Sequence, residues 1–170
     1  RAWPESLISD ETDQLMETGG GVRRALGLLE RGAFLVVNSD NVWLGEDVLR
    51  PLIGRWRPGM MEALLLLTPR ENALGYTRAG DFDLGDSGRL VRRGDRDGAP
   101  YVYTGAQIIT AAAMKRGPRR DPFSMNLIWD ELIAKGQAFG VIHRGGWVDV
   151  GTPEGLELAR EAVAAERPRR

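Results

Sequence analysis

Two aspartates stand at the ends of apolar segments that read as buried β-strands. Asp40 closes the segment Phe34-Leu35-Val36-Val37-Asn38-Ser39-Asp40, and Asp149 follows Trp147-Val148. Ligands of open α/β sheets bind at the carboxyl edge of the strands, so we expect both carboxylates at such an edge. Two carboxylates there can share one hard cation, Mg²⁺, which completes its coordination shell with phosphate oxygens. The pair therefore suits chemistry on a nucleoside triphosphate.

Each aspartate also has a simpler interpretation. An Asp after a strand is often a turn residue or a helix cap. Asp149 is followed by Val150-Gly151-Thr152-Pro153, in which Thr152 and Pro153 predict the N-cap and first residue of a helix. The metal-binding interpretation therefore depends on what the rest of the chain contains.

The composition is typical of a cytoplasmic globular protein. The chain has 170 residues, of which 42% are hydrophobic and 28% charged, with a net charge of -1. This length is enough for one domain with a real core. The small net charge gives no bulk attraction to nucleic acid or to anionic membranes, and no apolar run approaches the ~20 residues of a membrane span. We therefore expect a cytoplasmic protein with no nucleic-acid and no membrane partner.

Cysteine and histidine usage excludes several kinds of site. The chain has no Cys, which rules out disulfides, thiolate metal sites and cysteine nucleophiles. The single His143 rules out a multi-histidine metal site and leaves little room for a Ser-His-Asp triad. We interpret His143 as a structural residue, because a lone His has no visible catalytic partner in the sequence.

Hydrophobic patterning predicts alternating strands and helices with an inserted hairpin. Continuous apolar runs at 34–37 and 63–67 are typical of central strands that are covered on both faces. Two alternating segments, 81–84 and 89–92, flank the turn Gly85-Asp86-Ser87-Gly88 and predict the hairpin. Further strands are expected at 7–9, 101–109, 138–142 and 147–150, and helices after Gly21, over 47–56, from Asp121-Pro122 and from Pro153. We expect a single α/β domain over residues 1–170, with a mixed, mostly parallel sheet sandwiched by helices.

The segment Glu17-Thr18-Gly19-Gly20-Gly21 precedes a predicted helix and reads as a small Gly-rich loop. Glycines at such a position let a flat base or a phosphate approach backbone N–H groups, and Thr18 is a candidate N-cap. The segment matches neither the P-loop nor the dinucleotide fingerprint. A flexible turn followed by a cap is the alternative.

Six segments, taken together and in this order, resemble the sugar-1-phosphate nucleotidyltransferases. They are residues 15–21, 34–40, 80–82, 103–108, 122–126 and 147–154. The last, Trp-Val-Asp-Val-Gly-Thr-Pro-Glu, is the most specific, because a strand, an Asp, Gly-Thr-Pro and a helix follow in a fixed order. The resemblance is strongest to the compact bacterial branch of N-acetylmuramate 1-phosphate uridylyltransferases and mannose-1-phosphate guanylyltransferases. It covers nearly the whole chain and implies a Rossmann-like nucleotidyltransferase fold.

The resemblance also implies a reaction and a role for each matching residue. An NTP and a sugar 1-phosphate give an NDP-sugar and pyrophosphate, with Mg²⁺ as cofactor, in the synthesis or recycling of cell-wall or surface-sugar precursors. By this resemblance Asp40 and Asp149 are the catalytic metal ligands. The implied nucleotide-binding residues are Thr18, Gly19, Gly20 and Asn38, and the implied sugar-phosphate residues are Gly80, Asp81, Thr104 and Gly105.

The chain departs from the family pattern at its start. Family members begin with a strand and a Gly-rich, Arg-containing loop that wraps the triphosphate, and nothing here matches that loop. The sequence therefore predicts a domain truncated at its amino terminus, with an exposed sheet edge and little or no activity on its own.

Two other functions are compatible with the residues. A nucleotide-sugar-using glycosyltransferase also ends a strand with metal-binding acids, but usually carries Asp-x-Asp, whereas Asp40 is followed by Asn41 and Val42. A non-catalytic nucleotide-sugar-binding module is the other. The choice between UTP and GTP, the identity of the sugar and the formation of a homodimer are left open.

Overall fold

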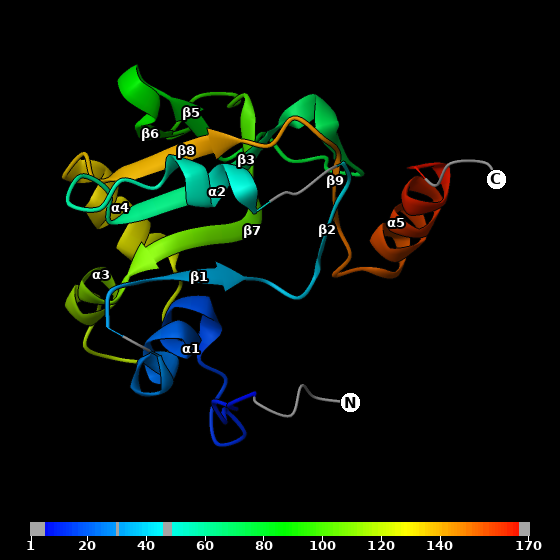
Figure 1. Ribbon diagram of the computed structural model, residues 1–170. Helices are drawn as coiled ribbons and strands as arrows, with labels where there is room; N and C mark the ends of the chain where they lie inside the picture. Colours follow the sequence, from blue (N-terminus) through cyan, green and yellow to red (C-terminus); the bar gives the residue numbers. More distant parts are fainter. Residues whose placement is uncertain (1–5, 30, 46–48, 167–170) are drawn as a thin grey trace.

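Strand β7 (Tyr101–Thr110) is the axis of the main sheet in the computed structural model, which describes residues 6–29, 31–45 and 49–166. Strand β3 (Ala63–Pro69) pairs along one edge of β7, while β1 (Ala33–Val37) and β5 (Phe82–Leu84) pair with the two ends of its other edge. Strand β8 (Ala138–Ile142) extends the sheet beyond β3, and β6 (Leu90–Arg92) extends it beyond β5. Figure 1 shows β1, β7, β3 and β8 as neighbours across this sheet.

A second, small sheet lies beside the carboxyl end of β1. It consists of β2 (Asn41–Trp43), β9 (Trp147–Asp149) and β4 (Ala73–Leu74), with β9 in the middle. Because β2 begins directly after Asp40 and pairs with β9, segments more than a hundred residues apart in the chain become neighbours.

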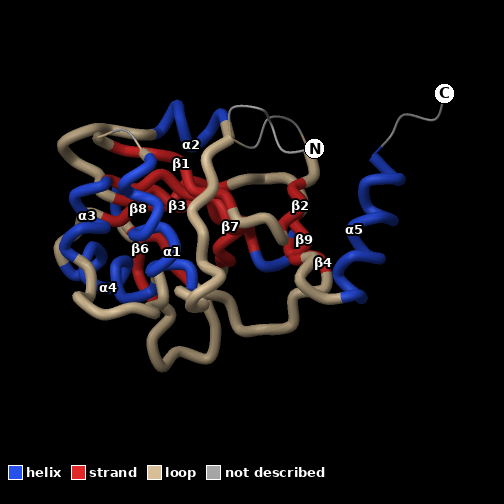
Figure 2. Tube along the Cα trace, turned by 90° about the horizontal axis from the view of Figure 1, so that it is seen from below, coloured by secondary structure: helices blue, strands red, loops and turns tan. Residues whose placement is uncertain are grey.

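Helices cover both faces of the main sheet. On one face lie α1 (Glu17–Ala25), α3 (Ala111–Arg116) and α4 (Asn126–Ala134), and on the other lies α2 (Arg50–Arg55). The short 3₁₀ turns are η1 (Leu26–Leu28), η2 (Arg70–Asn72) and η3 (Asp86–Gly88). Helix α5 (Pro153–Glu166) extends beside β9 and away from the main sheet (Figures 1 and 2). Apart from α5, the arrangement is the predicted sandwich of helices around a sheet.

The apolar run at the start of β3 explains why this strand is central. Ala63, Leu65 and Leu67 belong to the core under α3 and α4, whereas Leu64 and Leu66 belong to the core under α2. All five side chains are fully buried. A strand covered on both faces needs apolar residues at every position, and the sequence prediction for this strand is confirmed.

The prediction of a mostly parallel sheet is wrong. β7 runs antiparallel to β1, β3 and β5, and β3–β8 is the parallel pair of the main sheet within the described residues. The chain returns from β3 to β7 through the β5–β6 hairpin, not through a crossover helix, and this connection reverses the direction of β7. β1 is also not a doubly covered central strand: among the described strands it pairs with β7 alone, and Leu35 and Val37 are 40% and 45% exposed.

The remaining element predictions divide into confirmed and corrected ones. The hairpin and the strands expected at 101–109, 138–142 and 147–150 are present, and Thr152 caps α5 by accepting a hydrogen bond from Gly155 N at 3.1 Å. Residues 7–9 form no strand. Helix α4 begins at Asn126 instead of Asp121-Pro122, because the backbone of Phe123 is hydrogen-bonded to Met16 O and Gly20 N and not within a helix. Of the helix expected over 47–56, residues 47 and 48 lie outside the described residues, and α2 covers 50–55. No helix in the described part of the chain combines the length and apolarity needed to cross a membrane.

Candidate active site

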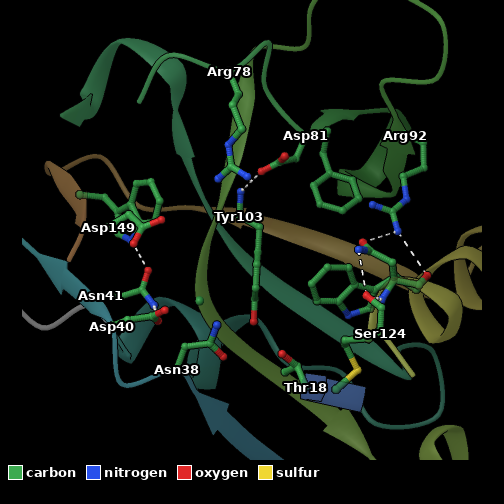
Figure 3. A pocket seen from close by; sticks show the side chains of 16 residues that line it. Thr18, Asn38, Asp40, Asn41, Arg78, Asp81, Arg92, Tyr103, Ser124 and Asp149 are labelled. Atoms are coloured by element: carbon green, nitrogen blue, oxygen red, sulfur yellow. Dashed lines mark hydrogen bonds between the residues drawn. The ribbon is translucent and has the colours of Figure 1, made fainter. Parts of the chain in front are cut away.

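A cavity of about 270 Å³ opens where the main sheet meets the small sheet (Figure 3). Its walls come from α1, the turn between β1 and β2, β5, β7, the start of α4 and β9. Six of the residues predicted from the sequence line it: Thr18, Asn38, Asp40, Asp81, Gly105 and Asp149. Gly19, Gly20, Gly80 and Thr104 are not among its lining residues.

Asp40 and Asp149 meet across the β2–β9 pairing. Asn41 stands opposite Asp149 in the ladder, and Val150 N donates to Asp40 O at 2.9 Å. Gly151 lies between the two side chains. If it carried a Cβ, that atom would lie 3.0 Å from Asp149 Oδ1 and 3.7 Å from Asp40 Oδ2. The two carboxylates therefore border one small volume at the wall of the cavity, as the sequence predicted.

Both carboxylates are oriented by hydrogen bonds that leave one oxygen each available. Asn41 Nδ2 donates to Asp40 Oδ1 at 2.8 Å, and Gly151 N donates to Asp149 Oδ1 at 2.9 Å. Among the described residues no donor reaches the Oδ2 atom of either side chain. Both residues are exposed, so a ligand that approaches from the cavity meets two free carboxylate oxygens.

This donor set fits a magnesium ion. Mg²⁺ prefers oxygen ligands and is usually held by one or two carboxylates, with phosphate and water completing its shell. Within residues 6–29, 31–45 and 49–166 no group of three or more His, Cys, Asp or Glu side chains is arranged to hold a metal. Two free carboxylate oxygens beside a polar cavity match the magnesium pattern and not that of an all-protein metal cage.

Asn41 connects this pair to the main sheet. Its Oδ1 accepts from the buried indole Nε1 of Trp147 at 2.9 Å, and the same Nε1 also lies 3.1 Å from Thr104 O. Gly105 makes room for Asn41, because a Cβ at Gly105 would lie 2.3 Å from Asn41 Nδ2. Gly105 also has a φ of 83°, in the region that favours glycine. Gly105 therefore supports the site through the space it leaves.

Thr104 and Gly80 support the site from behind its wall. The Thr104 hydroxyl is fully buried and donates to Leu66 O at 3.0 Å, so the side chain holds β7 to β3. Gly80 has a φ of 86°, and a Cβ there would lie 2.1 Å from Ala99 O. Gly80 thus permits the tight turn that delivers Asp81 to the cavity.

Asp81 is held in place by its neighbours in the hairpin region. Its Oδ2 accepts from Tyr103 N at 3.0 Å, and its Oδ1 accepts from the Tyr76 hydroxyl at 3.4 Å. Burial, followed by the nearby charge of Asp81, raises the pKa of Tyr76, so this hydroxyl stays a donor at neutral pH. Asp81 therefore presents an oriented carboxylate to the cavity (Figure 3).

The prediction of a Gly-rich loop at 17–21 is wrong, because these residues form the first turns of α1. The helix begins at Glu17, its N-cap residue is Met16, and Thr18 does not cap it. A Cβ on Gly19 would lie 2.5 Å from the Phe123 ring, and Gly20 N donates to Phe123 O at 3.1 Å. The glycines therefore allow α1 to pack against the segment before α4, which leaves Thr18 at the cavity.

Several lining residues were not predicted as site residues from the sequence. They are Asn41, Arg78, Phe82, Arg92, Tyr103, Ser124, Met125, Asn126 and Trp129. Arg92, on β6 of the hairpin, is one of the charged residues that line the cavity. Ser124 and Asn126 belong to a segment of the family resemblance, which was the one available signal for them. His143 is confirmed as structural: it is buried, and its Nε2 lies 2.9 Å from Leu44 O.

Comparison with solved structures shows a nucleotidyltransferase fold. The chain is similar to HddC from Yersinia pseudotuberculosis complexed with GMP-PN, with a TM-score of 0.67 and 19% identity over 89% of this chain and 64% of that chain. It is also similar to a putative glucose-1-phosphate thymidylyltransferase from Bacillus anthracis in complex with sucrose, with a TM-score of 0.64 and 15% identity over 88% of this chain and 61% of that chain. An inositol-1-phosphate CTP transferase from T. maritima gives a TM-score of 0.65 at 12% identity, over 87% and 62% of the two chains. Identities this low show the fold alone.

A curated relative shows the family. The chain is 36% identical over 165 residues to N-acetylmuramate alpha-1-phosphate uridylyltransferase from Caulobacter vibrioides, a match that covers 96% of this chain and 67% of the relative. The chain therefore belongs to the sugar-1-phosphate nucleotidyltransferase family, as the sequence motifs predicted. It spans about two thirds of the length of that relative and slightly less of the solved structures. No protein-family model matches the chain.

Proposed function

We propose that this protein transfers a nucleotidyl group from an NTP to a sugar 1-phosphate, with release of pyrophosphate. Family membership supports the reaction class, and the 36% identical relative supports UTP and N-acetylmuramate 1-phosphate as the substrates to be tested first. The observation that carries the proposal is the convergence of Asp40 and Asp149 on one volume beside the cavity. A role in cell-wall sugar synthesis or recycling follows from these substrates.

The reaction itself needs positioning more than acid–base chemistry. A phosphate oxygen of the sugar 1-phosphate forms a bond to the α-phosphorus of the NTP, and the bond from that phosphorus to the bridging oxygen breaks, which releases pyrophosphate. The attacking oxygen is already anionic, so no general base is required. Two polyanions must be held in line and their repulsion offset.

Asp40 and Asp149 are proposed as the ligands of a magnesium ion. When bound there, Mg²⁺ supplies positive charge beside the phosphates. The protein contributes the orientation of both carboxylates, which Asn41 and the Gly151 backbone fix by hydrogen bonds. These contacts pre-set the side chains before substrate arrives.

Arg78 is proposed to bind a phosphate directly. It lines the cavity and also a neighbouring pocket that it shares with Asp149. Its guanidinium carbon lies 5.0 Å from the centre of the Tyr76 ring, and no carboxylate of the described residues forms a salt bridge with it. A cation that lines the same cavity as Asp149, and that forms no salt bridge with a described carboxylate, suits the binding of a phosphate there.

The other predicted site residues keep their assignments within this proposal. Thr18 and Asn38 line the side of the cavity assigned to the nucleotide, where Gly19 and Gly20 act by letting α1 pack closely. Asp81 is proposed to contact the sugar, with Gly80, Thr104 and Gly105 setting the shape of that wall. A cytoplasmic location belongs to the same proposal, because the reaction consumes a nucleoside triphosphate. A homodimer is a further possibility that the proposal does not require.

The test is pyrophosphate release from UTP or GTP with N-acetylmuramate 1-phosphate and Mg²⁺, measured on this chain together with whatever its reading frame encodes before Arg1, because nothing in the chain matches the family's triphosphate loop. Asp149→Asn is expected to lower the rate at least about 100-fold, because one ligand charge of a site with few protein ligands is lost. Asp95→Asn, in the exposed loop after the hairpin, is the control and is expected to keep wild-type activity. Activity of Asp149→Asn within a few-fold of wild type contradicts the metal-ligand assignment.

The same assay separates the other two functions. A glycosyltransferase releases an NDP from an NDP-sugar and produces no pyrophosphate. A non-catalytic binding module binds UTP or the NDP-sugar, measured by calorimetry, without turnover. Either outcome in the wild-type protein overturns the proposed reaction.

A further inference from the structure

Arg92 lies on β6 and lines the cavity on the side away from the two aspartates. Figure 3 shows Arg92 reaching into the cavity at one side, with Asp40, Asn41 and Asp149 grouped at the other. The proposed phosphate chemistry occupies the aspartate side. The side of the cavity that Arg92 lines is therefore available to another part of the sugar phosphate.

The guanidinium of Arg92 is held in one plane from several directions. Its Nε donates to Asp130 Oδ1 at 2.7 Å, and its Nη2 donates to Asn126 Oδ1 at 2.9 Å and to Asn126 O at 3.2 Å. Its central carbon lies 4.8 Å from the centre of the Phe82 ring and 5.7 Å from that of Trp129. A side chain fixed in this way binds a ligand with little further loss of conformational freedom.

One nitrogen of this guanidinium, Nη1, remains available for a ligand. Among the described residues, no group accepts a hydrogen bond from Nη1, although Arg92 lines the cavity. The side chain of Asp130 is 56% exposed and that of Arg92 is 30% exposed, so water screens the carboxylate more than the guanidinium. The N-terminal end of α4, at Asn126, adds a partial positive charge at the same corner. This corner of the cavity favours an anion.

We propose that Arg92 determines specificity by binding a carboxylate carried by the sugar ring, so that the protein selects acidic sugar 1-phosphates over neutral ones. This inference rests on the proposed function. The two N–H groups of Nη1 lie in the guanidinium plane and can donate to a carboxylate oxygen, and the fixed cation offsets the carboxylate charge. The other interpretation is that Arg92 only ties β6 to α4 through Asp130 and Asn126.

The experiment compares ligands that differ only in this carboxylate. N-acetylmuramate 1-phosphate carries a 3-O-lactyl carboxylate, its lactyl methyl ester lacks the charge, and N-acetylglucosamine 1-phosphate lacks the whole group. Calorimetry on the wild-type protein is expected to show about 10- to 100-fold tighter binding of the acid than of the ester, which is the effect of one hydrogen-bonded charge pair. Comparison of the ester with the acid separates charge from bulk without any mutation.

Variants then assign the preference to Arg92. Arg92→Gln is expected to bind the acid and the ester equally, and Arg92→Lys to keep only a small part of the preference, because an ammonium does not replace the planar fork. Arg89→Gln is the matched control: Arg89 also stacks on a ring, that of Phe139 at 5.3 Å, but does not line the cavity. This control is expected to keep the full preference.

Two results overturn the inference. One is equal binding of acid and ester by the wild type. The other is an Arg92→Gln protein that folds, by circular dichroism, and loses affinity for both ligands by the same factor, which is the mark of a purely structural tie. Failure of the proposed function is distinguishable, because a wild type that prefers the acid but releases no pyrophosphate rejects the reaction and supports the Arg92 assignment. If the acid and the ester bind equally and give equal rates of pyrophosphate release, the proposed reaction is supported and the Arg92 assignment is rejected.

Discussion

Asn41 is the residue on which the geometry of the aspartate pair depends. It accepts from Trp147 Nε1 and donates to Asp40 Oδ1, so one amide links a buried indole to an exposed carboxylate. Its place is available because Gly105 on β7 has no side chain. The orientation of Asp40 thus depends on Gly105 of β7, which leaves the space that Asn41 occupies.

We expect Gly105→Ala to lose both stability and activity. The φ of 83° costs an alanine roughly 1–2 kcal/mol, and the new Cβ also displaces Asn41. Gly59→Ala is a matched control, since Gly59 has a φ of 82° and no atom within 4 Å of the Cβ position. Urea unfolding and pyrophosphate release measure the two effects. If both variants lose the same stability and Gly105→Ala stays active, Asn41 does not depend on this space.

Helix α1 carries the nucleotide side of the proposed site by its packing. Gly19 and Gly20 are buried against the segment before α4, where Arg23 also forms a salt bridge with Asp121 at 2.5 Å and lies 4.6 Å from the centre of the Phe123 ring. These contacts fix the start of the helix. Thr18 owes its place at the cavity to them.

We expect Gly19→Ala, a change in the packing of α1, to weaken nucleotide binding. A Cβ there lies 2.5 Å from the Phe123 ring and 2.7 Å from Phe123 O, so the start of α1 must move away and take Thr18 with it. Such overpacking costs typically ~1–3 kcal/mol, which a thermal unfolding curve detects, and calorimetry measures the UTP affinity. Gly27→Ala, at a position with nothing within 4 Å, is the control and should leave both unchanged. Wild-type UTP affinity in Gly19→Ala would separate α1 from nucleotide binding.

At the scale of the whole molecule, β1 presents an unpaired edge of the main sheet in the part of the chain that the structure describes. Within the described residues no strand pairs with the side of β1 that faces away from β7, and Leu35 and Val37 on this strand are 40% and 45% exposed. Unpaired backbone beside exposed apolar side chains is a surface that associates. The chain studied as it stands is therefore expected to self-associate.

Light scattering coupled to size-exclusion chromatography tests this expectation. The mass of the wild-type chain should rise with concentration, and the double variant Leu35→Lys/Val37→Lys should reduce the rise, because lysines on an edge strand oppose pairing. Ile53→Lys, which removes an apolar residue 66% exposed on α2, is the control and should not change association. A wild-type chain that stays monomeric at every concentration refutes the role of this edge.

Local chemistry in the sequence was enough to predict the strands at 63–67, 101–109, 138–142 and 147–150, the hairpin, the cap of α5 and the family. Continuous apolar runs, alternation of apolar and polar residues, and Gly-Thr-Pro each favour a local structure through residues that are neighbours in the chain. Their consequences can therefore be predicted without the fold. The convergence of Asp40 with Asp149 was also expected, but it comes from the antiparallel pairing of β2 with β9 in the small sheet and not from a shared carboxyl edge of one sheet.

Only the tertiary structure decided the direction of β7, the helical state of 17–21 and the membership of Arg78, Arg92 and Asn41 in the cavity. Each of these depends on contacts between segments that are distant in the chain: the hairpin connection reverses β7, Phe123 demands glycine at Gly19, and Trp147 places Asn41. An arginine in a hairpin is a solvated charge or a cavity wall according to what packs against it. Here Phe82, Trp129 and Asp130 hold Arg92 at the cavity. The local sequence around Arg92 does not show that these three residues pack against it.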